Sequence, residues 1–266
     1  MEEEATGKLG CYGSQIRVIE KGADSAAEET ILLWGIQQPI SSKPNAFVSQ
    51  SSLQLRLDAC GHSLLILQSP SSLGRPGVTG AVIWDSGVVL AKFLEHAVDS
   101  KNLHLKGKKV IELGSGCGLV GCIAALLGSH VILTDLPDRL RLLNKNVETN
   151  TCNGMRGSAT VKELTWGDDL APDIVGFSPD VILGSDVVYS EDAVADLLRT
   201  MAALCSDSTT VFIAGELRND AILEHFLEAA MEQFEIGRVR QNDCHPDFRS
   251  PRVVIYVLVK RMIGVR

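Results

Sequence analysis

The sequence lacks the features that mark exported and membrane-spanning proteins. Its apolar runs, such as VIYVLVK near the C-terminus, end well short of the roughly 18 residues that a membrane-spanning helix needs. The chain starts with the acidic run MEEE, and the basic start and apolar stretch of a secretory signal are missing. We therefore expect no membrane association and a protein that stays inside the cell, in the cytoplasm, with the nucleus open as a second compartment.

Cysteine and histidine are placed in ways that disfavour disulfides and metal sites. The seven cysteines form no CxxC pair and leave one unmatched in any disulfide scheme, so reduced thiols are the simpler interpretation. The six histidines do not stand beside cysteines at zinc-ligand spacings, and no metal site is predicted.

Basic residues are fewer than acidic ones. The chain has 25 Lys and Arg against 33 Asp and Glu, a net charge of −8. This charge repels the phosphate backbone of a nucleic acid over most of the protein surface, which disfavours a dedicated nucleic-acid binder. The net charge does not exclude a small basic patch. With 266 residues, 45% of them apolar, the chain can bury the core of one main domain, and a monomer is the expected state.

The patterns along the chain predict an α/β domain that follows a hairpin. Residues 1–45 mix charge, Gly, Ser and Pro without a sustained period, which predicts a loosely ordered N-terminal segment. Residues 46–80 contain alternating leucines, a Cys-Gly turn, a second apolar run and a Ser/Pro/Gly-rich stretch. They are expected to form a β-hairpin and a linker into a main domain of residues 81–266.

The main domain alternates between helical and strand-like segments, and several strands are continuous apolar runs, as in strands buried on both faces. This alternation predicts repeated βαβ units and a doubly wound sheet that ends in a strand pair. Strands are expected at 109–113, 131–134, 160–162, 181–184, 211–214, 236–240 and 252–260, and helices at 86–97, 119–127, 138–148, 191–204 and 219–233.

The strongest local signal is the run VIELGSGCG at residues 110–118, where an apolar strand leads into three alternating glycines and then a helix. Glycines lack the Cβ atoms that would keep a ligand away from the backbone, and open α/β sheets bind ligands at this end of their strands. The loop is therefore predicted to hold a nucleotide-like ligand.

The identity of that ligand depends on the register of the glycines. Residues 116–121 also match the dinucleotide pattern GxGxxG, but Gly114 closes the strand, and counted from it the third glycine position holds Leu119. Glu112 would face an anionic pyrophosphate unfavourably, whereas a ligand with an ammonium and a sulfonium tolerates it. An NAD-dependent oxidoreductase is disfavoured and stays open as an alternative.

Asp135 ends the next strand, about 20 residues beyond the glycine loop. A carboxylate there can accept hydrogen bonds from both hydroxyls of a ribose. The alternative is a residue at the start of a helix, since Pro137 follows and proline is favoured in a first turn. NAD and S-adenosylmethionine both contain this ribose, so Asp135 does not discriminate between them.

Asp186 and Tyr189 follow the buried strand at 181–184, at the predicted ligand-binding edge. Alone, an Asp-x-x-Tyr run is a weak signal, because Asp is common in turns and Tyr often packs half-buried. Trp166 could stack on an adenine and Trp84 could line the same pocket. The alternative for each is a packing role, because a tryptophan side chain is more often part of the hydrophobic core than of a ligand site.

Taken together, the runs VIWDSGVVLAKFLE, VIELGSGCGLVG, ILTDL, LTWGDD and VILGSDVVYSED, in this order, resemble the seven-strand methyltransferases of the protein-lysine branch, family 16. The resemblance covers residues 53–260. It implies a Rossmann-like, doubly wound sheet of seven strands in the order 3-2-1-4-5-7-6, the last antiparallel, with the hairpin as an N-terminal extension. It also implies S-adenosyl-L-methionine as the cofactor and a lysine of a protein substrate as the methyl acceptor.

The resemblance also implies roles for single residues. Asp186 and Tyr189 match the family's DxxY motif and would be the catalytic residues that frame the acceptor amine. Ser185 stands where relatives often have Ala. Beside Glu112, the cofactor would be lined by Trp84, Gly114, Ser115, Gly116, Asp135, Trp166 and Ser185.

One run that is present and one motif that is missing narrow the class of substrate that the resemblance implies. PDFRS near the C-terminus resembles a run in members that methylate an AAA-type ATPase, so an AAA-type ATPase or a chaperone is expected as the substrate. The Asn-Pro-Pro-Tyr type of motif, typical of enzymes acting on DNA bases or glutamine, is missing. A small-molecule N-methyltransferase and a non-catalytic cofactor-binding module stay open as alternatives.

Overall fold

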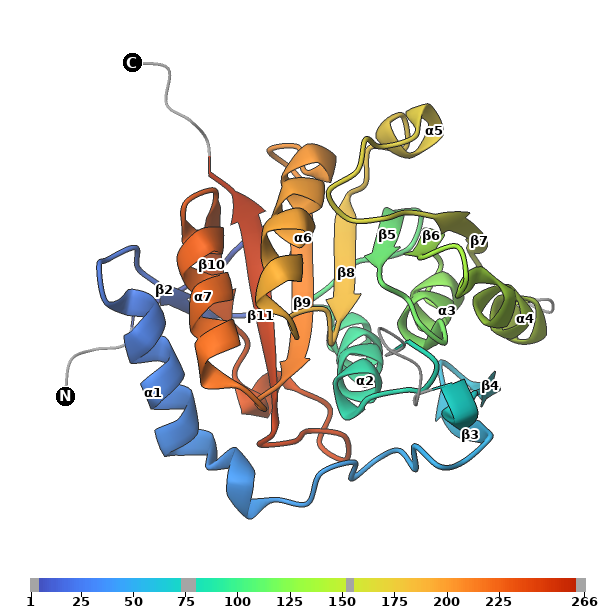
Figure 1. Cartoon of the computed structure of the whole chain (residues 1–266), viewed down its shortest axis with the longest axis horizontal. Helices are drawn as coiled ribbons and strands as arrows, with labels where there is room; N and C mark the ends of the chain where they lie inside the picture. The colour runs from blue at the N-terminus through green and yellow to red at the C-terminus, as the bar shows by residue number, and fades with distance from the viewer. Residues whose placement is uncertain (1–4, 73–79, 152–155, 262–266) are drawn as a thin grey trace.

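A computed structural model describes residues 5–72, 80–151 and 156–261. Its centre is a nine-stranded mixed sheet with helices on both faces (Figure 1). Parallel pairing joins five strands: β5 (Lys109–Leu113), β6 (His130–Asp135), β7 (Ser158–Glu163), β8 (Val181–Ser185) and β9 (Thr210–Glu216). Antiparallel pairing adds β11 (Val253–Lys260), β10 (Phe234–Arg238), β2 (Ile16–Ile19) and β1 (Thr6–Gly7).

Read from the β7 edge, the strands follow the order β7, β6, β5, β8, β9, β11, β10, β2 and β1. The α/β class and the mixed sheet are confirmed. The predicted count of seven strands is wrong, because β2 pairs with β10 and β1 pairs with β2, which lengthens the sheet at that edge.

Two apolar cores lie on the two faces of the sheet. Side chains of α2 (Asp85–Asp99), α3 (Leu119–Leu126) and α4 (Leu140–Thr151) fill one core, and those of α1 (Ser25–Gln37), α6 (Glu191–Leu204) and α7 (Asp220–Met231) fill the other. The short α5 (Pro172–Val175) adds Ile174 to the second core. Successive strand residues point to opposite faces, so the central strands are apolar at nearly every position.

The N-terminal segment differs from the loosely ordered lead-in expected for residues 1–45. It forms β1, β2, α1 and the 3-10 turn η1 (Pro39–Ser41), and α1 lies beside α7 (Figure 1). The helical period is hard to see in the sequence because Ile31 and Ile36 are exposed while polar residues face inward. The buried face of α1 consists of Ala26, Glu29, Thr30, Leu33 and Gln37.

A buried group of charges attaches this segment to the sheet. The carboxylate of Glu29 is 1% exposed and lies 2.6 Å from Nε of Arg238 on β10 and 3.3 Å from Nε of Arg17 on β2. A buried carboxylate is tolerated only when its charge is balanced, and here two guanidinium groups balance it. Glu29 therefore joins α1 to two neighbouring strands.

The predicted hairpin is confirmed as β3 (Gln54–Ala59) and β4 (His62–Leu67), which pair with each other antiparallel. Asn146 and Asn150, one helical turn apart on α4, attach it to the domain. The amide of Asn146 exchanges two hydrogen bonds with the backbone of Leu67, each 2.9 Å, and Asn150 does the same with Leu65 at 2.7 and 2.9 Å. The two asparagines thereby extend the backbone pairing of β4.

After β4 the chain forms the 3-10 turn η2 (Pro70–Ser72), and residues 73–79 of the predicted linker lie outside the described residues. A third 3-10 turn, η3 (Gln241–Asp243), connects β10 to β11. Within the described ranges, the helices are all too short or too polar to cross a bilayer.

We expect Glu29→Ala to lower the free energy of unfolding by about 3 to 5 kcal/mol, because it leaves the buried Arg238 guanidinium without its carboxylate. Urea denaturation followed by circular dichroism measures the change. Glu28→Ala is the matched control on the same helix, since Glu28 is exposed, and it should change stability by less than about 1 kcal/mol. Equal effects of the two substitutions on stability would contradict the conclusion that Glu29 joins α1 to the sheet.

Candidate active site

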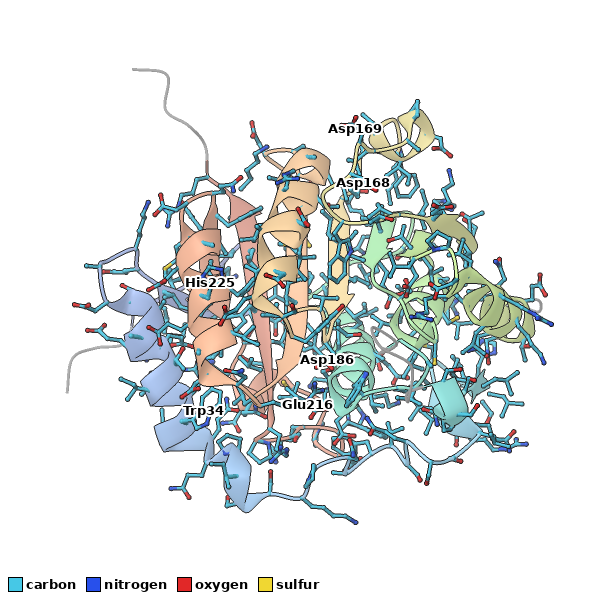
Figure 2. The ribbon with its side chains drawn as sticks, in the orientation of Figure 1. Trp34, Asp168, Asp169, Asp186, Glu216 and His225 are labelled. Carbon is cyan, nitrogen blue, oxygen red and sulfur yellow. The ribbon has the colours of Figure 1, made fainter. Side chains whose placement is uncertain are left out.

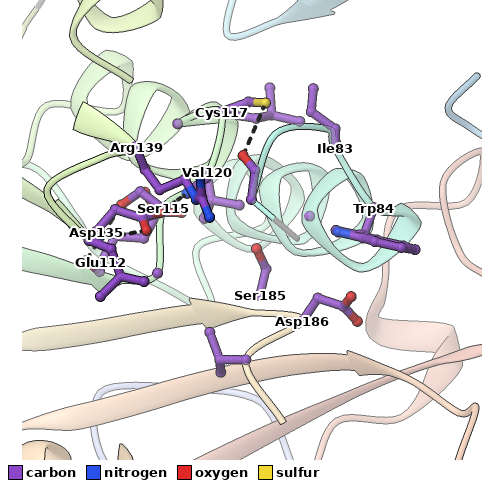
Figure 3. A pocket seen from close by; sticks show the side chains of 18 of the residues that line it. Ile83, Trp84, Glu112, Ser115, Cys117, Val120, Asp135, Arg139, Ser185 and Asp186 are labelled. Carbon is purple, nitrogen blue, oxygen red and sulfur yellow. Dashed lines mark hydrogen bonds between the residues drawn. The ribbon is translucent and has the colours of Figure 1, made fainter. Parts of the chain in front are cut away.

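A cavity of about 220 Å³ lies at the carboxyl ends of β5, β6 and β8 (Figure 3). The chain leaves β5 toward β6 on one side and returns to β8 on the other, so this is the switch point where open α/β sheets bind ligands. All ten residues predicted from the sequence line the cavity: Trp84, Glu112, Gly114, Ser115, Gly116, Asp135, Trp166, Ser185, Asp186 and Tyr189. The structure thus brings the predicted set together, and the part that each residue plays stays a prediction.

The packing around the glycine loop requires glycine at two of its positions, Gly114 and Gly116. Gly114 has φ +64° and Gly116 has φ +53°, a left-handed conformation that other residues adopt at a cost. A Cβ at Gly114 would lie 2.9 Å from Cζ2 of Trp166, and one at Gly116 would lie 3.1 Å from the carbonyl oxygen of Gly80. The glycines therefore allow Trp166 and the backbone before α2 to close around the cavity.

Asp135 holds the loop from the end of β6. One carboxylate oxygen accepts a hydrogen bond from the N–H of Gly116 at 2.6 Å, and the other accepts one from Leu136 at 2.8 Å. Each oxygen keeps a second lone pair, which suits a pair of ribose hydroxyls. Burial raises the pKa of Asp135 above its ordinary value, against the effect of these hydrogen bonds. Since α4 begins only at Leu140, Asp135 does not cap that helix.

Glu112 is the most deeply buried acid of the cavity, 1% exposed on β5. Its carboxylate accepts a hydrogen bond of 3.0 Å from the N–H of Gly121 in the first turn of α3. Burial raises the pKa of Glu112 to about 8, although Ser115 and Gly121 act to lower it. A cation bound in the cavity would favour the ionised form of this carboxyl group.

At the opposite end of the cavity, Asp186 follows β8 with φ +57°, and its N–H donates to the carbonyl of Ala214 on β9 at 2.8 Å. Its carboxylate accepts a hydrogen bond of 2.5 Å from Nη2 of Arg218. Nε of Arg218 donates to Glu216 at 3.1 Å, and the guanidinium carbon lies 4.3 Å from the ring centroid of Trp84. We call Trp84, Asp186, Glu216 and Arg218 the acceptor cluster.

Burial raises the pKa of Asp186, while the Arg218 cation acts to lower it. Figure 3 shows the Asp186 carboxylate on the same side of the cavity as the Trp84 ring, and Figure 2 places Glu216 beside it. Tyr189 is 43% exposed and lies on the rim. The acceptor cluster therefore presents a partly buried carboxylate, paired with Arg218, and the accessible phenol of Tyr189 lines the same cavity.

Glu216 and Arg218 were not identified from the sequence. Their positions in the sequence do carry a signal, because both are charged residues at the carboxyl end of β9. This strand pairs with β8, and residues that follow neighbouring parallel strands lie together at the ligand-binding edge of the sheet. Recognising them requires the strand order, because β9 lies next to β8 only once the sheet has formed.

The stretch of chain that follows α1 also reaches this end of the cavity. The carboxylate of Asp85 accepts hydrogen bonds from the N–H groups of Ala46 at 2.6 Å and Phe47 at 3.1 Å, and the N–H of Asp85 donates to Glu216 at 3.2 Å. Ala46 and Phe47 are thereby connected to the acceptor cluster through one residue, Asp85.

Comparison with known proteins identifies the family. Residues 67–233 match the family described as lysine methyltransferase. The chain is 40% identical over 190 residues to the protein N-lysine methyltransferase METTL21A of Mus musculus, covering 69% of this chain and 81% of that protein. It is 38% identical over 197 residues to the EEF1A lysine methyltransferase 3 of Mus musculus, covering 74% and 80%. The chain belongs to the lysine methyltransferase family.

Membership of the lysine methyltransferase family decides between the cofactors that the glycine loop left open. The methyl donor is S-adenosylmethionine, and the dinucleotide interpretation of residues 116–121 is set aside. In this lysine methyltransferase the buried Glu112 and the paired Asp186 stand at opposite ends of the same cavity. One acidic group is thus close to the glycine loop and the other close to the rim.

We expect Glu112→Gln to change how stability depends on pH. Between its ordinary pKa of 4.5 and the raised value of about 8, Glu112 binds a proton in the folded protein but not in the unfolded chain. Its contribution to stability is therefore present at low pH and is lost as the pH rises toward about 8. Glutamine can still accept the Gly121 hydrogen bond and does not titrate. The wild type should lose melting temperature relative to Glu112→Gln between about pH 6 and about pH 8, and parallel curves would contradict the raised pKa.

Proposed function

We propose that the protein transfers the methyl group of S-adenosylmethionine to the side-chain amine of a lysine in a protein substrate. The observation that carries this proposal is a cavity at the switch point of the sheet that is lined by the glycine loop, Asp186 and Tyr189, in a chain of the lysine methyltransferase family. The relatives METTL21A and EEF1A lysine methyltransferase 3 are described as lysine methyltransferases acting on proteins, which supports a protein rather than a metabolite as the substrate.

The residues of the cavity fit the cofactor. Asp135 offers its free lone pairs to the ribose, and Leu164 and Trp166 offer an apolar wall to the adenine. The buried Glu112 offers a carboxyl group near the glycine loop, and a cation bound there would favour its ionised form. When bound, S-adenosylmethionine supplies an electrophilic methyl group on a positively charged sulfur. Trp84 and Ser185 line the cavity between the glycine loop and the acceptor cluster and would hold the methyl-bearing part in place.

The acceptor lysine must lose its proton before it can attack. With an ordinary pKa near 10.4, deprotonation at pH 7 costs about 4.6 kcal/mol. A bare carboxylate would increase this cost, because it stabilises the ammonium form. In the acceptor cluster, Arg218 lies 2.5 Å from Asp186 and shares its positive charge with Glu216 at 3.1 Å. The cluster therefore keeps a net negative charge that attracts the ammonium, and we assign Asp186 the capture and orientation of the amine rather than a lowering of its pKa.

Tyr189 borders the opening of the cavity through which the lysine would enter. Its ring is 43% exposed on the rim, so it can border the lysine stem and align the amine lone pair with the methyl group. Alignment of this kind accelerates a displacement without changing the chemistry of the nucleophile. We assign Asp186 the capture of the amine and Tyr189 its alignment.

We expect Asp186→Asn to lower the rate of methyl transfer at least about 100-fold, because the amine loses the charged partner that places it. Affinity for the cofactor should change less than about 3-fold, since Asp186 lies at the acceptor end. Radiolabelled methyl transfer to cell lysate proteins measures the rate, and calorimetry measures the affinity. Asp207→Asn, at an exposed turn before β9, is the control. Full activity of Asp186→Asn would remove this residue from the mechanism.

We expect Asp135→Ala to weaken cofactor binding by about 1.5 to 3 kcal/mol, or roughly 10- to 150-fold, through loss of charge-assisted hydrogen bonds. Calorimetry with S-adenosylhomocysteine measures the effect, and a thermal melt checks that the fold is retained. Asp169→Ala is the control, since Asp169 is exposed near α5, away from the cavity (Figure 2). Equal affinities would show that Asp135 does not contact the cofactor.

The substrate class is a narrower proposal. We propose an AAA-type ATPase or a chaperone, on the resemblance of residues 246–250 to a run in the valosin-containing-protein lysine methyltransferase. In this structure Phe248 of that run packs against Phe47 and over the ammonium of Lys92, so the run also has a packing role. Mass spectrometry of lysate proteins methylated by the wild type tests the class, and a methylated elongation factor 1A alone would contradict it. A monomer acting in the cytoplasm, with the nucleus open as a second compartment and without nucleic acid, completes the proposal.

A further inference from the structure

A second cavity, of about 140 Å³, lies next to the acceptor cluster between β9 and α7. We call it the side pocket. Most of its lining residues are aliphatic or aromatic, and they include Val188, Tyr189, Ile213, Gly215, Leu223 and Phe226. Tyr189 lines both the side pocket and the cofactor cavity, so the two spaces are neighbours.

Gly215 is the reason that the side pocket is open. Alternate residues of a strand face the same side, so Gly215 faces the same side as Ile213, whose side chain lies in the core beneath α6 and α7. A Cβ built on Gly215 meets nothing within 4 Å, and its φ is not in the left-handed range that requires glycine. The backbone does not need glycine at this position, and the absent side chain leaves room in the pocket.

The size and chemistry of the side pocket suit one large apolar side chain. An engineered cavity of about 150 Å³ with a similar aliphatic and aromatic lining stays dry and binds benzene. Leucine, methionine and phenylalanine side chains are of this size. The charged residues of the pocket, Glu216 and Arg218, belong to the acceptor cluster and are paired with each other, and Asn219 and Tyr256 add side chains with polar groups to the lining.

The side pocket is continuous with the place where the lysine would enter. Arg218 lines the pocket and also donates to the Asp186 carboxylate at 2.5 Å, so only one side chain separates the pocket from the predicted amine partner. An extended segment advances about 3.3 Å per residue, which brings the neighbours of a bound lysine within reach of this space.

We propose that the side pocket binds a large apolar side chain of the substrate protein, leucine, methionine or phenylalanine, within two residues of the methylated lysine. The proposal rests on the proposed function and adds a determinant of substrate choice to it. Burial of such a side chain contributes about 10- to 100-fold to kcat/KM. Gly215 is then a specificity-determining residue, because a long side chain at this position, unlike the single methyl group of alanine, would fill the space that the substrate side chain needs.

The test compares Gly215→Leu, which fills the pocket, with Gly215→Ala, which adds one methyl group to open space. Radiolabelled cofactor is incubated with lysate and each variant, and mass spectrometry reads the residues around each labelled lysine. Wild type and Gly215→Ala should label lysines with a large apolar residue within two positions. Gly215→Leu should label the same proteins about 10- to 100-fold more slowly, with cofactor affinity unchanged by calorimetry.

Leu223→Ala provides a second variant in case Gly215→Leu does not fold. It enlarges the pocket from the α7 side and should shift the preference toward phenylalanine or tryptophan at the same position. Unchanged rates in Gly215→Leu, or labelled lysines without an apolar neighbour, would overturn the side-pocket proposal while leaving the proposed function standing. A wild type that labels no protein would instead overturn the proposed function, and the side-pocket proposal with it.

Discussion

The pairing of Asp186 with Arg218 is the interaction on which the acceptor end of the molecule depends. Asp186 adopts φ +57°, a conformation that costs a residue other than glycine about 1 to 2 kcal/mol. Two contacts with β9 and the turn beyond it hold it there: its N–H donates to Ala214, and its carboxylate accepts from Arg218. Without Arg218 this buried carboxylate would be uncompensated, and its raised pKa would bring it closer to protonation.

The same guanidinium lies between the two cavities. It stacks over Trp84, which lines the cofactor cavity, and it lines the side pocket, so one cation contacts the walls of both spaces. Glu216 extends the connection to Asp85 and from there to the backbone of Ala46 and Phe47. The stretch of chain that follows α1 is thus hydrogen-bonded to the acceptor cluster through Asp85.

The opposite wall of the cavity is supported in a similar way. Asn146 on α4 pairs with Leu67 of the hairpin and also donates to the carbonyl of Cys117 in the glycine loop, at 2.9 Å. A fully buried amide thereby links the hairpin to the cofactor loop. The stretch of chain that follows α1 and the hairpin are both attached to residues that shape the site.

Local pattern was enough to identify β5 with its glycine loop and to place Asp135 and Asp186 at the ends of buried strands, because a buried parallel strand is a continuous apolar run and its ligand-binding end is marked by small or acidic residues. The role of Asp186 came from the family resemblance, since an Asp-x-x-Tyr run alone is a weak signal. It was not enough for α1, whose buried face carries Glu29 and Gln37 while Ile31 is exposed, since the burial of Glu29 depends on guanidinium groups that Arg17 and Arg238 bring from two strands. Nor could pattern pair Arg218 with Asp186 across 32 residues, or show that Gly215 opens a pocket. Those contacts exist only between neighbouring strands and the helix packed on them, so the assembled sheet alone decides them.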